Sequence, residues 1–258
     1  MTARELKGKY KRSVLGWGWS LVNPLATMAI YTLVFRFVLQ VKAPAGQRTG
    51  INVFALWLLC GLVPWNFVSN SLTGGINALV SNGNLIKKVY FPRETLVASA
   101  VFALVVTMAI ELGVLSVALL FFGNVVLLWL PALVLLVGLI TVFAMGIALG
   151  LSVVNVYFRD AQYLVGIFLQ LWFYITPIVY PIRYVQAKAG VHVLGVSVYT
   201  LYQLNPMAEF VEAFRSVLYD LQVPPIHTLV AVTLWSVGSL LIGFAVFRRY
   251  QGRLAEEL

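Results

Sequence analysis

Charged side chains are scarce in this 258-residue sequence: only 10% of the residues are Asp, Glu, Lys or Arg, whereas 61% are hydrophobic. A soluble domain carries about 25% charged residues, so this composition is that of a membrane protein. Basic residues outnumber acidic ones by 18 to 9. They form no single face or stripe, and no nucleic-acid motif is visible, so we expect no nucleic-acid partner.

Cysteine and histidine are also scarce. The single cysteine, Cys60, lies in an apolar run and cannot form an intrachain disulfide. We interpret it as a small buried residue. His192 and His227 lie far apart in polar segments, so we interpret both as solvated and predict no metal centre.

Motifs for bond-making chemistry are missing as well. The nine acidic residues are dispersed, and the sequence has no G-x-x-x-x-G-K-[ST] loop, no nucleophile elbow and no H-E-x-x-H. We therefore expect a chain that is not an enzyme and binds no cofactor itself. If it transports a substrate, the energy must come from another chain or from an ion gradient.

Long apolar segments dominate the sequence. They are long enough to cross about 30 Å of hydrocarbon as helices, and they lack the alternation of membrane strands. The sequence thus predicts an all-α polytopic membrane protein, a single domain over 1–258, with six transmembrane helices at residues 21–39, 53–71, 95–122, 125–156, 162–180 and 226–247. The first is longer than the roughly 7–15 apolar residues of a signal peptide, so we interpret it as a retained span.

Two of these segments, 95–122 and 125–156, are longer than a straight crossing needs, so they must tilt, protrude or break. Gly113 and Gly138 are candidate places to bend. The very short turn at 122–124 predicts a tight antiparallel hairpin.

The basic residues predict the orientation, because Lys and Arg concentrate on the cytoplasmic side. With the N-terminus inside, both termini are cytoplasmic and residues 82–94 lie inside. Twelve basic residues then fall on inner segments and five on outer ones. The inner ones are Arg4, Lys7, Lys9, Lys11, Arg12, Lys87, Lys88, Arg93, Arg159, Arg248, Arg249 and Arg253, and the outer ones are Lys42, Arg48, Arg183, Lys188 and Arg215.

The first 20 residues show a helical stripe. Leu6, Tyr10, Val14 and Trp17 recur at spacings of four, four and three residues. We predict an amphipathic helix in the inner headgroup region, with Trp17 and Trp19 at the interface. An ordinary basic flank without a helix is the alternative.

The outer segment 181–225 contains a second amphipathic pattern, "LNPMAEFVEAFRSVLYD", from 204 to 220. Asn205 can cap a helix and Pro206 suits its first position. Glu212 and Arg215 are spaced to form an ion pair. We therefore predict an external amphipathic helix that ends before "VPP" at 223–225.

Charges inside the spans and clustered aromatics leave alternatives open. Glu111 lies in the third span, where it indicates either a proton or substrate site or a carboxyl that is buried against another helix or lies near an interface. Arg36 lies near a span end and can snorkel. The aromatics near the outer part of the fifth span suit either an interfacial belt or a path for sugar rings; they are Phe168, Trp172, Phe173, Tyr174, Tyr180, Tyr184, Tyr199 and Tyr202.

Four segments in order resemble the membrane subunits of type-2 ABC transporters that export polysaccharides such as O-antigen, capsule and teichoic acid. They are "ELKGKYKRSVLGWGWSLVNPL" (5–25), "NGNLIKKVYFPRE" (82–94), "NVYFRDAQYLVGIFLQLWFYITPIVYP" (155–181) and "QLNPMAEFVEAFRSVL" (203–218). The resemblance implies a homodimer in the bacterial cytoplasmic membrane, joined to two copies of a separate ATPase that binds ATP and Mg. It also implies a channel for a lipid-linked glycan.

The resemblance further implies roles for particular residues. Segment 82–94 would be a cytoplasmic coupling helix that docks in a groove of the ATPase, and segment 181–225 would supply short gate helices. The groove would take Leu85, Ile86, Val89 and Tyr90, and its rim would meet Lys87, Lys88 and Arg93. The glycan path would include Phe168, Trp172, Tyr174 and Tyr180, and the interfacial helix would carry Tyr10, Val14, Trp17 and Trp19.

Three other readings compete with this one. A type-2 ABC permease for a drug or lipid would share the architecture, and the outer aromatics argue weakly against it. A membrane enzyme acting on lipid-linked sugars would need clustered acidic or metal-binding residues in an inner loop. A secondary transporter using Glu111 would be favoured by inverted repeats, and we see none.

Overall fold

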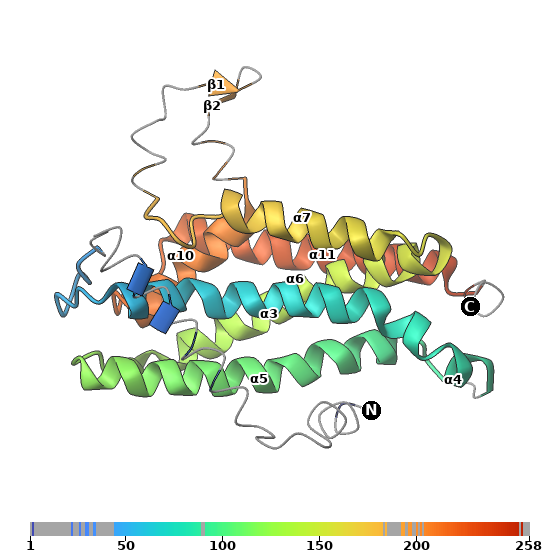
Figure 1. The fold of residues 1–258 in the computed structure, drawn as a ribbon, viewed down its shortest axis with the longest axis horizontal. Helices are drawn as coiled ribbons and strands as arrows, with labels where there is room; N and C mark the ends of the chain where they lie inside the picture. The colour runs from blue at the N-terminus through green and yellow to red at the C-terminus, as the bar shows by residue number, and fades with distance from the viewer. Residues whose placement is uncertain are drawn as a thin grey trace.

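The computed structural model describes residues 44–88, 91–182 and 204–252, with isolated positions between 2 and 34, between 184 and 202, and at 254. Long helices run side by side along the longest axis of the molecule (Figure 1). Their bounds are α3 Phe54–Ser81, α5 Glu94–Phe121, α6 Leu130–Tyr157, α7 Ala161–Ile175 and α11 Ile226–Tyr250. The shorter elements are α4 Gly83–Lys88, the 3-10 helix η3 Val126–Trp129, α10 Pro206–Leu218, and strands β1 His192–Val193 and β2 Val196–Ser197, which pair antiparallel.

Four helical stretches are long and apolar enough to cross a membrane: Phe54–Ser81, Glu94–Phe121, Val126–Tyr157 and Ile226–Tyr250. They confirm the predicted all-α polytopic class and four of the six predicted spans. The predicted span at 162–180 is instead the 15-residue helix α7, which ends at Ile175. At 1.5 Å per residue α7 is about 22 Å long, less than the hydrocarbon thickness. The predicted span at 21–39 and helix at 1–20 lie outside the continuously described residues.

Helix α3 extends ten residues beyond the predicted end at residue 71. The extension mixes polar side chains with apolar ones, of which Leu72, Ile76 and Leu79 are buried. Thr73, Asn77 and Ser81 each donate a hydrogen bond to the carbonyl four residues earlier. Their polar groups are thus satisfied within the helix, and the chain continues to Ser81.

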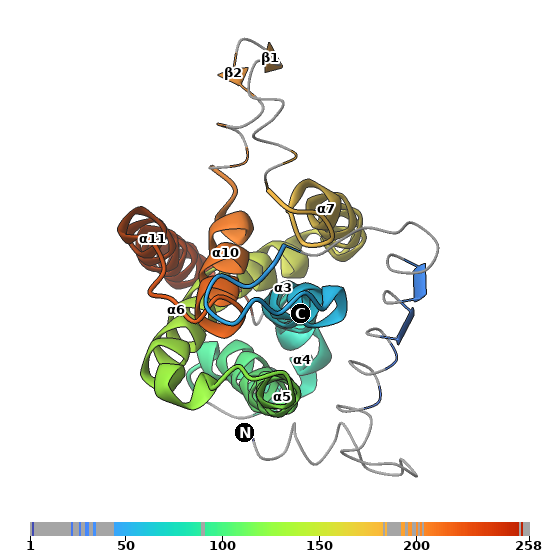
Figure 2. The same cartoon turned by 90° about the vertical axis from the view of Figure 1, so that its left-hand side faces the viewer.

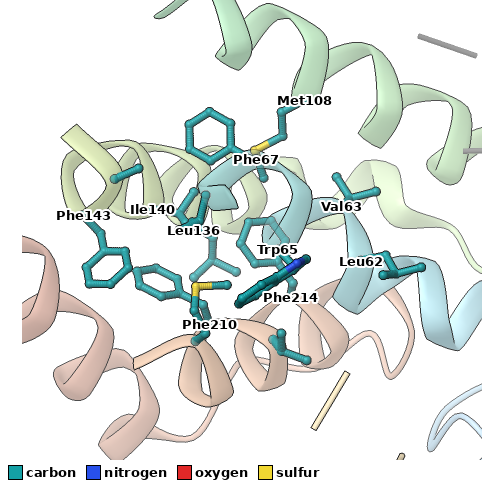
Figure 3. Packing of buried hydrophobic residues seen from close by; sticks show 14 of the residues in the cluster. Leu62, Val63, Trp65, Phe67, Met108, Leu136, Ile140, Phe143, Phe210 and Phe214 are labelled. Atoms are coloured by element: carbon teal, nitrogen blue, oxygen red, sulfur yellow. The ribbon is translucent and has the colours of Figure 1, made fainter. Parts of the chain in front are cut away.

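Helix α3 lies among α5, α6, α7 and α10 when the molecule is seen from its end (Figure 2). Its side chains meet those of the neighbours in one apolar core (Figure 3). Phe143 of α6 and Phe210 of α10 pack with ring centroids 5.3 Å apart. Cys60 is fully buried in this helix, as predicted.

The turn between α5 and α6 confirms the predicted tight hairpin. Gly123 has φ +90°, a backbone conformation that favours glycine. The amide of Asn124 returns to the carbonyl of Leu119 at 3.0 Å and closes the end of α5. Neither Gly113 nor Gly138 interrupts its helix.

Helices α6 and α11 approach until their backbones touch. A Cβ on Gly243 would lie 1.8 Å from the carbonyl oxygen of Gly146, so no side chain fits there. Ser236 donates to the carbonyl of Leu139 at 2.8 Å, and Ser239 donates to that of Phe143 at 3.2 Å. Small residues with interhelical hydrogen bonds are the usual means of joining helices in a membrane.

Candidate functional site

Asn205 joins the start of α10 to the end of α7. Its side-chain oxygen accepts from the amide of Met207 at 3.0 Å, which confirms the predicted N-cap. The same oxygen accepts from the indole Nε1 of Trp172 at 2.8 Å, and its amide nitrogen donates to Thr176 Oγ1 at 3.0 Å. One buried amide therefore fixes α10 against the segment that carries the aromatics.

The four residues predicted to line a glycan path contact one another in two pairs, Phe168 with Trp172 and Tyr174 with Tyr180. Phe168 packs on Trp172 at 5.3 Å between centroids. The Tyr180 hydroxyl donates to the carbonyl of Tyr174 at 2.9 Å and lies 2.7 Å from the hydroxyl of Tyr202. Phe168 and Tyr174 are exposed, at 54% and 68%. The surface of α7 thus presents exposed aromatic rings, although Phe168 also contacts Trp172 and Tyr174 also contacts Phe173.

Trp172 differs from these exposed aromatics. Its ring meets Trp65 of α3 edge-on at 5.7 Å, and its indole N–H points to Asn205. The side chain is half-buried. Trp172 therefore holds α7 to α3 and α10, and only part of its ring remains available at the surface.

Arg215 is the most important residue that sequence reasoning placed wrongly. The spacing in α10 predicted a pair with Glu212, but among the described residues Arg215 forms no ion pair. Its side chain is 5% exposed and its guanidinium lies 3.6 Å from the centroid of the Trp57 ring. It donates to the carbonyls of Pro177 at 2.7 Å and Ile178 at 2.5 Å.

Burial sets the electrostatics around Arg215. It lowers the pKa of the guanidinium to about 10, which leaves the group charged at neutral pH. Burial also raises the pKa of the Glu212 carboxyl, and the charge of Arg215 offsets only part of this effect. The Arg215 cation thus donates to backbone carbonyls and lies over an aromatic ring, because these are the groups around its buried position.

Three loops are joined beyond α10. Asp220 accepts from the amide of Gln47 at 3.1 Å, and the Tyr219 hydroxyl donates to the carbonyl of Ile51 at 2.7 Å. Asn124 donates to the carbonyls of Leu218 and Tyr219 at 3.1 and 2.8 Å. Burial raises the pKa of Asp220. The loops 44–53, 122–125 and 219–222 therefore close this end of the bundle as one hydrogen-bonded unit.

The opposite end of the bundle carries α4 and the end of α11 (Figure 1). Ile86 is buried in the chain's own core, Leu85 is half-buried, and Lys87 and Lys88 are exposed. Val89 and Tyr90 lie outside the described residues. Arg93 donates a hydrogen bond to the carbonyl of Gln251, which joins the α4–α5 linker to the end of α11.

A hollow of about 570 Å³ lies between these segments. Its lining includes Lys87, Lys88, Arg93, Glu94 and Gln251. The predicted coupling segment thus borders an open, basic depression. Whether this surface contacts an ATPase stays a prediction.

The remaining candidate residues are placed only in part. Glu111 is half-buried in α5, and His227 is exposed, as predicted. Tyr10, Val14, Trp17 and Trp19 of the predicted interfacial helix lie outside the described residues, as does Arg36. Within the part of the chain that the structure describes, no group of three His, Cys, Asp or Glu side chains could hold a metal ion.

The apolar helices and their membrane-type packing define a multi-pass membrane protein. The ABC-2 type transporter family matches residues 1–219, and the chain belongs to this family. It is therefore a transport component, which confirms the family inferred from the four ordered segments.

The relatives are permease and transport proteins. The chain is 29% identical to the "O-antigen export system permease protein RfbA" of Myxococcus xanthus, over 100% of this chain and 94% of that one. It is 28% identical to the protein of the same name from Klebsiella pneumoniae, over 100% and 93%. It is 22% identical to the "Polysialic acid transport protein KpsM" of Escherichia coli, over 95% and 90%.

Proposed function

We propose that this chain is the transmembrane subunit of an ATP-driven exporter of a lipid-linked polysaccharide or related cell-wall glycan. The observation that carries the proposal is the similarity along nearly the whole chain to O-antigen and polysialic acid export proteins. The exposed aromatic faces of Phe168 and Tyr174 support it, because sugar rings stack on such faces. A permease for a drug or lipid is less favoured, since no relative named above carries such a name.

The proposed machine is a homodimer of this single-domain permease with two copies of a separate ATPase, which would bind ATP and Mg. Residues 82–94 would form the contact with the ATPase in the cytoplasm, and both termini would lie on that side. The twelve-to-five distribution of basic residues supports this orientation. The α10 end, with its gate segment, would then face the outside of the cytoplasmic membrane of a bacterium.

Deleting the gene in its bacterium and measuring surface polysaccharide tests the function. We expect lipid-linked glycan to accumulate inside the cell and surface glycan to disappear. Expression of the intact chain should restore surface glycan and remove the accumulated lipid-linked glycan, provided that the ATPase is present. Normal surface glycan in the deletion strain would refute the proposal.

The orientation has its own test. A cysteine introduced at Lys88 in a variant lacking Cys60 should react with a membrane-impermeant thiol reagent only after the cells are opened. A cysteine at the exposed Val223, at the α10 end, should react in intact cells. Labelling of position 88 from outside would reverse the orientation.

A further inference from the structure

The basic hollow at the α4 end continues onto the membrane-facing side of the bundle. Phe91 and Pro92 line both the hollow and a groove of about 460 Å³ whose other lining residues include Thr95, Ala98 and Phe102 of α5. Phe102 also lines a further groove of about 470 Å³ between α5 and α6. The three depressions thus follow one another along the first half of α5.

The polarity of these depressions changes along their course. Around the hollow stand three cations, Lys87, Lys88 and Arg93, against one carboxylate, Glu94. Arg93 donates a hydrogen bond to the carbonyl of Gln251, while both lysines are exposed. No ion pair with either lysine occurs among the described residues. The hollow therefore has positive charge available for a ligand.

The grooves along α5 and α6 offer almost no polar partner. Thr95 and Ser99 donate to the carbonyls of Pro92 and Leu96, and Thr141 donates to that of Val137. These three hydroxyls are satisfied by nearby backbone carbonyls, and apart from Thr2 the rest of the groove lining is apolar. Gly138 leaves open space where a side chain would stand.

We propose that the hollow and the two grooves form a binding site for an anionic phospholipid, with the phosphate at Lys87 and Lys88 and one acyl chain along α5. From Glu94 to Val105, α5 rises about 17 Å, close to the roughly 15 Å depth of one leaflet. Basic pockets at the cytoplasmic side of membrane helices bind such headgroups. The leaflet follows from the proposed orientation, whereas the site itself requires only that the α4 end lies at a membrane surface.

A protein partner is the competing occupant of the lysines, because the same segment is the predicted contact with the ATPase. The grooves favour the lipid, since they run along a membrane span that a soluble subunit cannot reach. The site also lies on α4, α5 and α6, whereas the aromatic faces proposed for the glycan belong to α7.

Native mass spectrometry of the purified full-length chain, without ATPase or glycan, tests the proposal. Phosphatidylglycerol should bind more tightly than phosphatidylcholine with the same acyl chains. Lys87→Ala with Lys88→Ala should weaken phosphatidylglycerol binding about 30-fold, as expected for two lost cations near a membrane surface. Arg248→Ala with Arg249→Ala is the matched control, because it removes two exposed cations outside the hollow, and it should leave binding unchanged.

The acyl chain has a separate pair of variants. Gly138→Phe should fill the groove between α5 and α6 and weaken phosphatidylglycerol binding. Gly113→Phe should not, because Gly113 also faces open space but does not line that groove. Equal effects of these two variants, or of the two double-alanine variants, would overturn the proposal.

Two further results would also overturn it. Displacement of phosphatidylglycerol by a polyprenyl phosphate at equal concentration would assign the site to a lipid carrier. Displacement by inorganic phosphate would assign the hollow to a free anion. If the double-lysine variant lost ATPase binding but kept phosphatidylglycerol, the lysines would serve the protein partner alone. Because no glycan enters the assay, its failure would leave the proposed export function standing.

Discussion

At the α10 end, side-chain hydrogen bonds join three loops and two helices, whereas at the α4 end exposed lysines border an open hollow. Both ends are polar caps on the same apolar bundle. At the first end the polar groups bind the protein's own backbone, as Arg215 and Asn124 do. At the second end Lys87 and Lys88 remain available to other molecules. The difference indicates that substitutions at the α10 end change stability, while those at the α4 end change binding.

The largest effect should come from Arg215→Ala. It leaves the carbonyls of Pro177 and Ile178 without their donor and removes the cation from the Trp57 ring. We expect a loss of roughly 3–5 kcal/mol in the free energy of unfolding, measured by thermal or denaturant unfolding in detergent. Arg48→Ala at the same end is the control, because Arg48 is exposed and lies 5.7 Å from the Trp129 ring. Equal stability of the two variants would contradict the comparison.

At the α4 end, Leu85→Asp with Val89→Asp should abolish capture of the ATPase, while the spans still insert in the membrane and the chain still dimerises. Each apolar side chain buried in a partner's groove contributes about 1.5–3 kcal/mol, and a carboxylate there adds a desolvation cost. Copurification of the ATPase measures the effect. Lys87→Ala with Lys88→Ala should reduce capture less, because rim charges contribute less than buried anchors. Full capture by the double-Asp variant would show that this segment is only a basic flank.

Asn124→Ala should cost about 2–3 kcal/mol of unfolding free energy. It removes the donor for the carbonyls of Leu218 and Tyr219 and the acceptor for the Thr49 hydroxyl, in a buried position. Unfolding midpoints report the loss. Ser81→Ala is a suitable control, since Ser81 is exposed and its hydroxyl donates within its own helix. A loss no larger than that of the control would mean that the loops are held by packing alone.

Substitutions of Trp172 and Tyr174 on α7 should separate an effect on stability from an effect on transport. Trp172→Phe removes the bond to Asn205 and should cost about 1 kcal/mol of stability. Tyr174→Ala should leave the unfolding midpoint unchanged, because the side chain is 68% exposed, yet lower export of the glycan. Stacking contributes roughly 0.5–1.5 kcal/mol by analogy with aromatic pairs. Unimpaired export by Tyr174→Ala combined with Phe168→Ala would remove this face from the glycan path.

The smallest effect should be a pH dependence at the α10 end. The pKa of Glu212 is raised in the folded protein by burial, so the stability linked to this group is present at low pH and lost as pH rises through the folded pKa. The unfolding midpoint of the wild type should therefore rise as pH is lowered from neutral. Glu212→Gln should show a smaller rise. A steeper pH dependence in that variant would contradict the assignment.

Local signals in the sequence predicted the elements well and the contacts between elements poorly. Asn205 and Pro206 predict the start of α10 because a cap acts on its own helix. Arg215 was assigned to Glu212 because helical spacing is visible in the sequence, whereas the carbonyls of Pro177 and Ile178 lie 38 and 37 residues away along the chain. The end of α3 was missed for a related reason, since Leu72, Ile76 and Leu79 are buried against other helices and the sequence does not show these neighbours.

The backbone contact between Gly146 and Gly243 bears on how the protein is made. The surface of α6 that α11 contacts is formed at Gly146, which has no side chain. This surface is present once α6 is inserted, before the ribosome has synthesised α11. Until α11 is present, the carbonyls of Leu139 and Phe143 lack the hydrogen bonds that Ser236 and Ser239 donate to them. The contact between α6 and α11 can therefore form only after α11 has been synthesised and inserted, and the touching backbones at Gly146 and Gly243 fix the depth of α11 against α6.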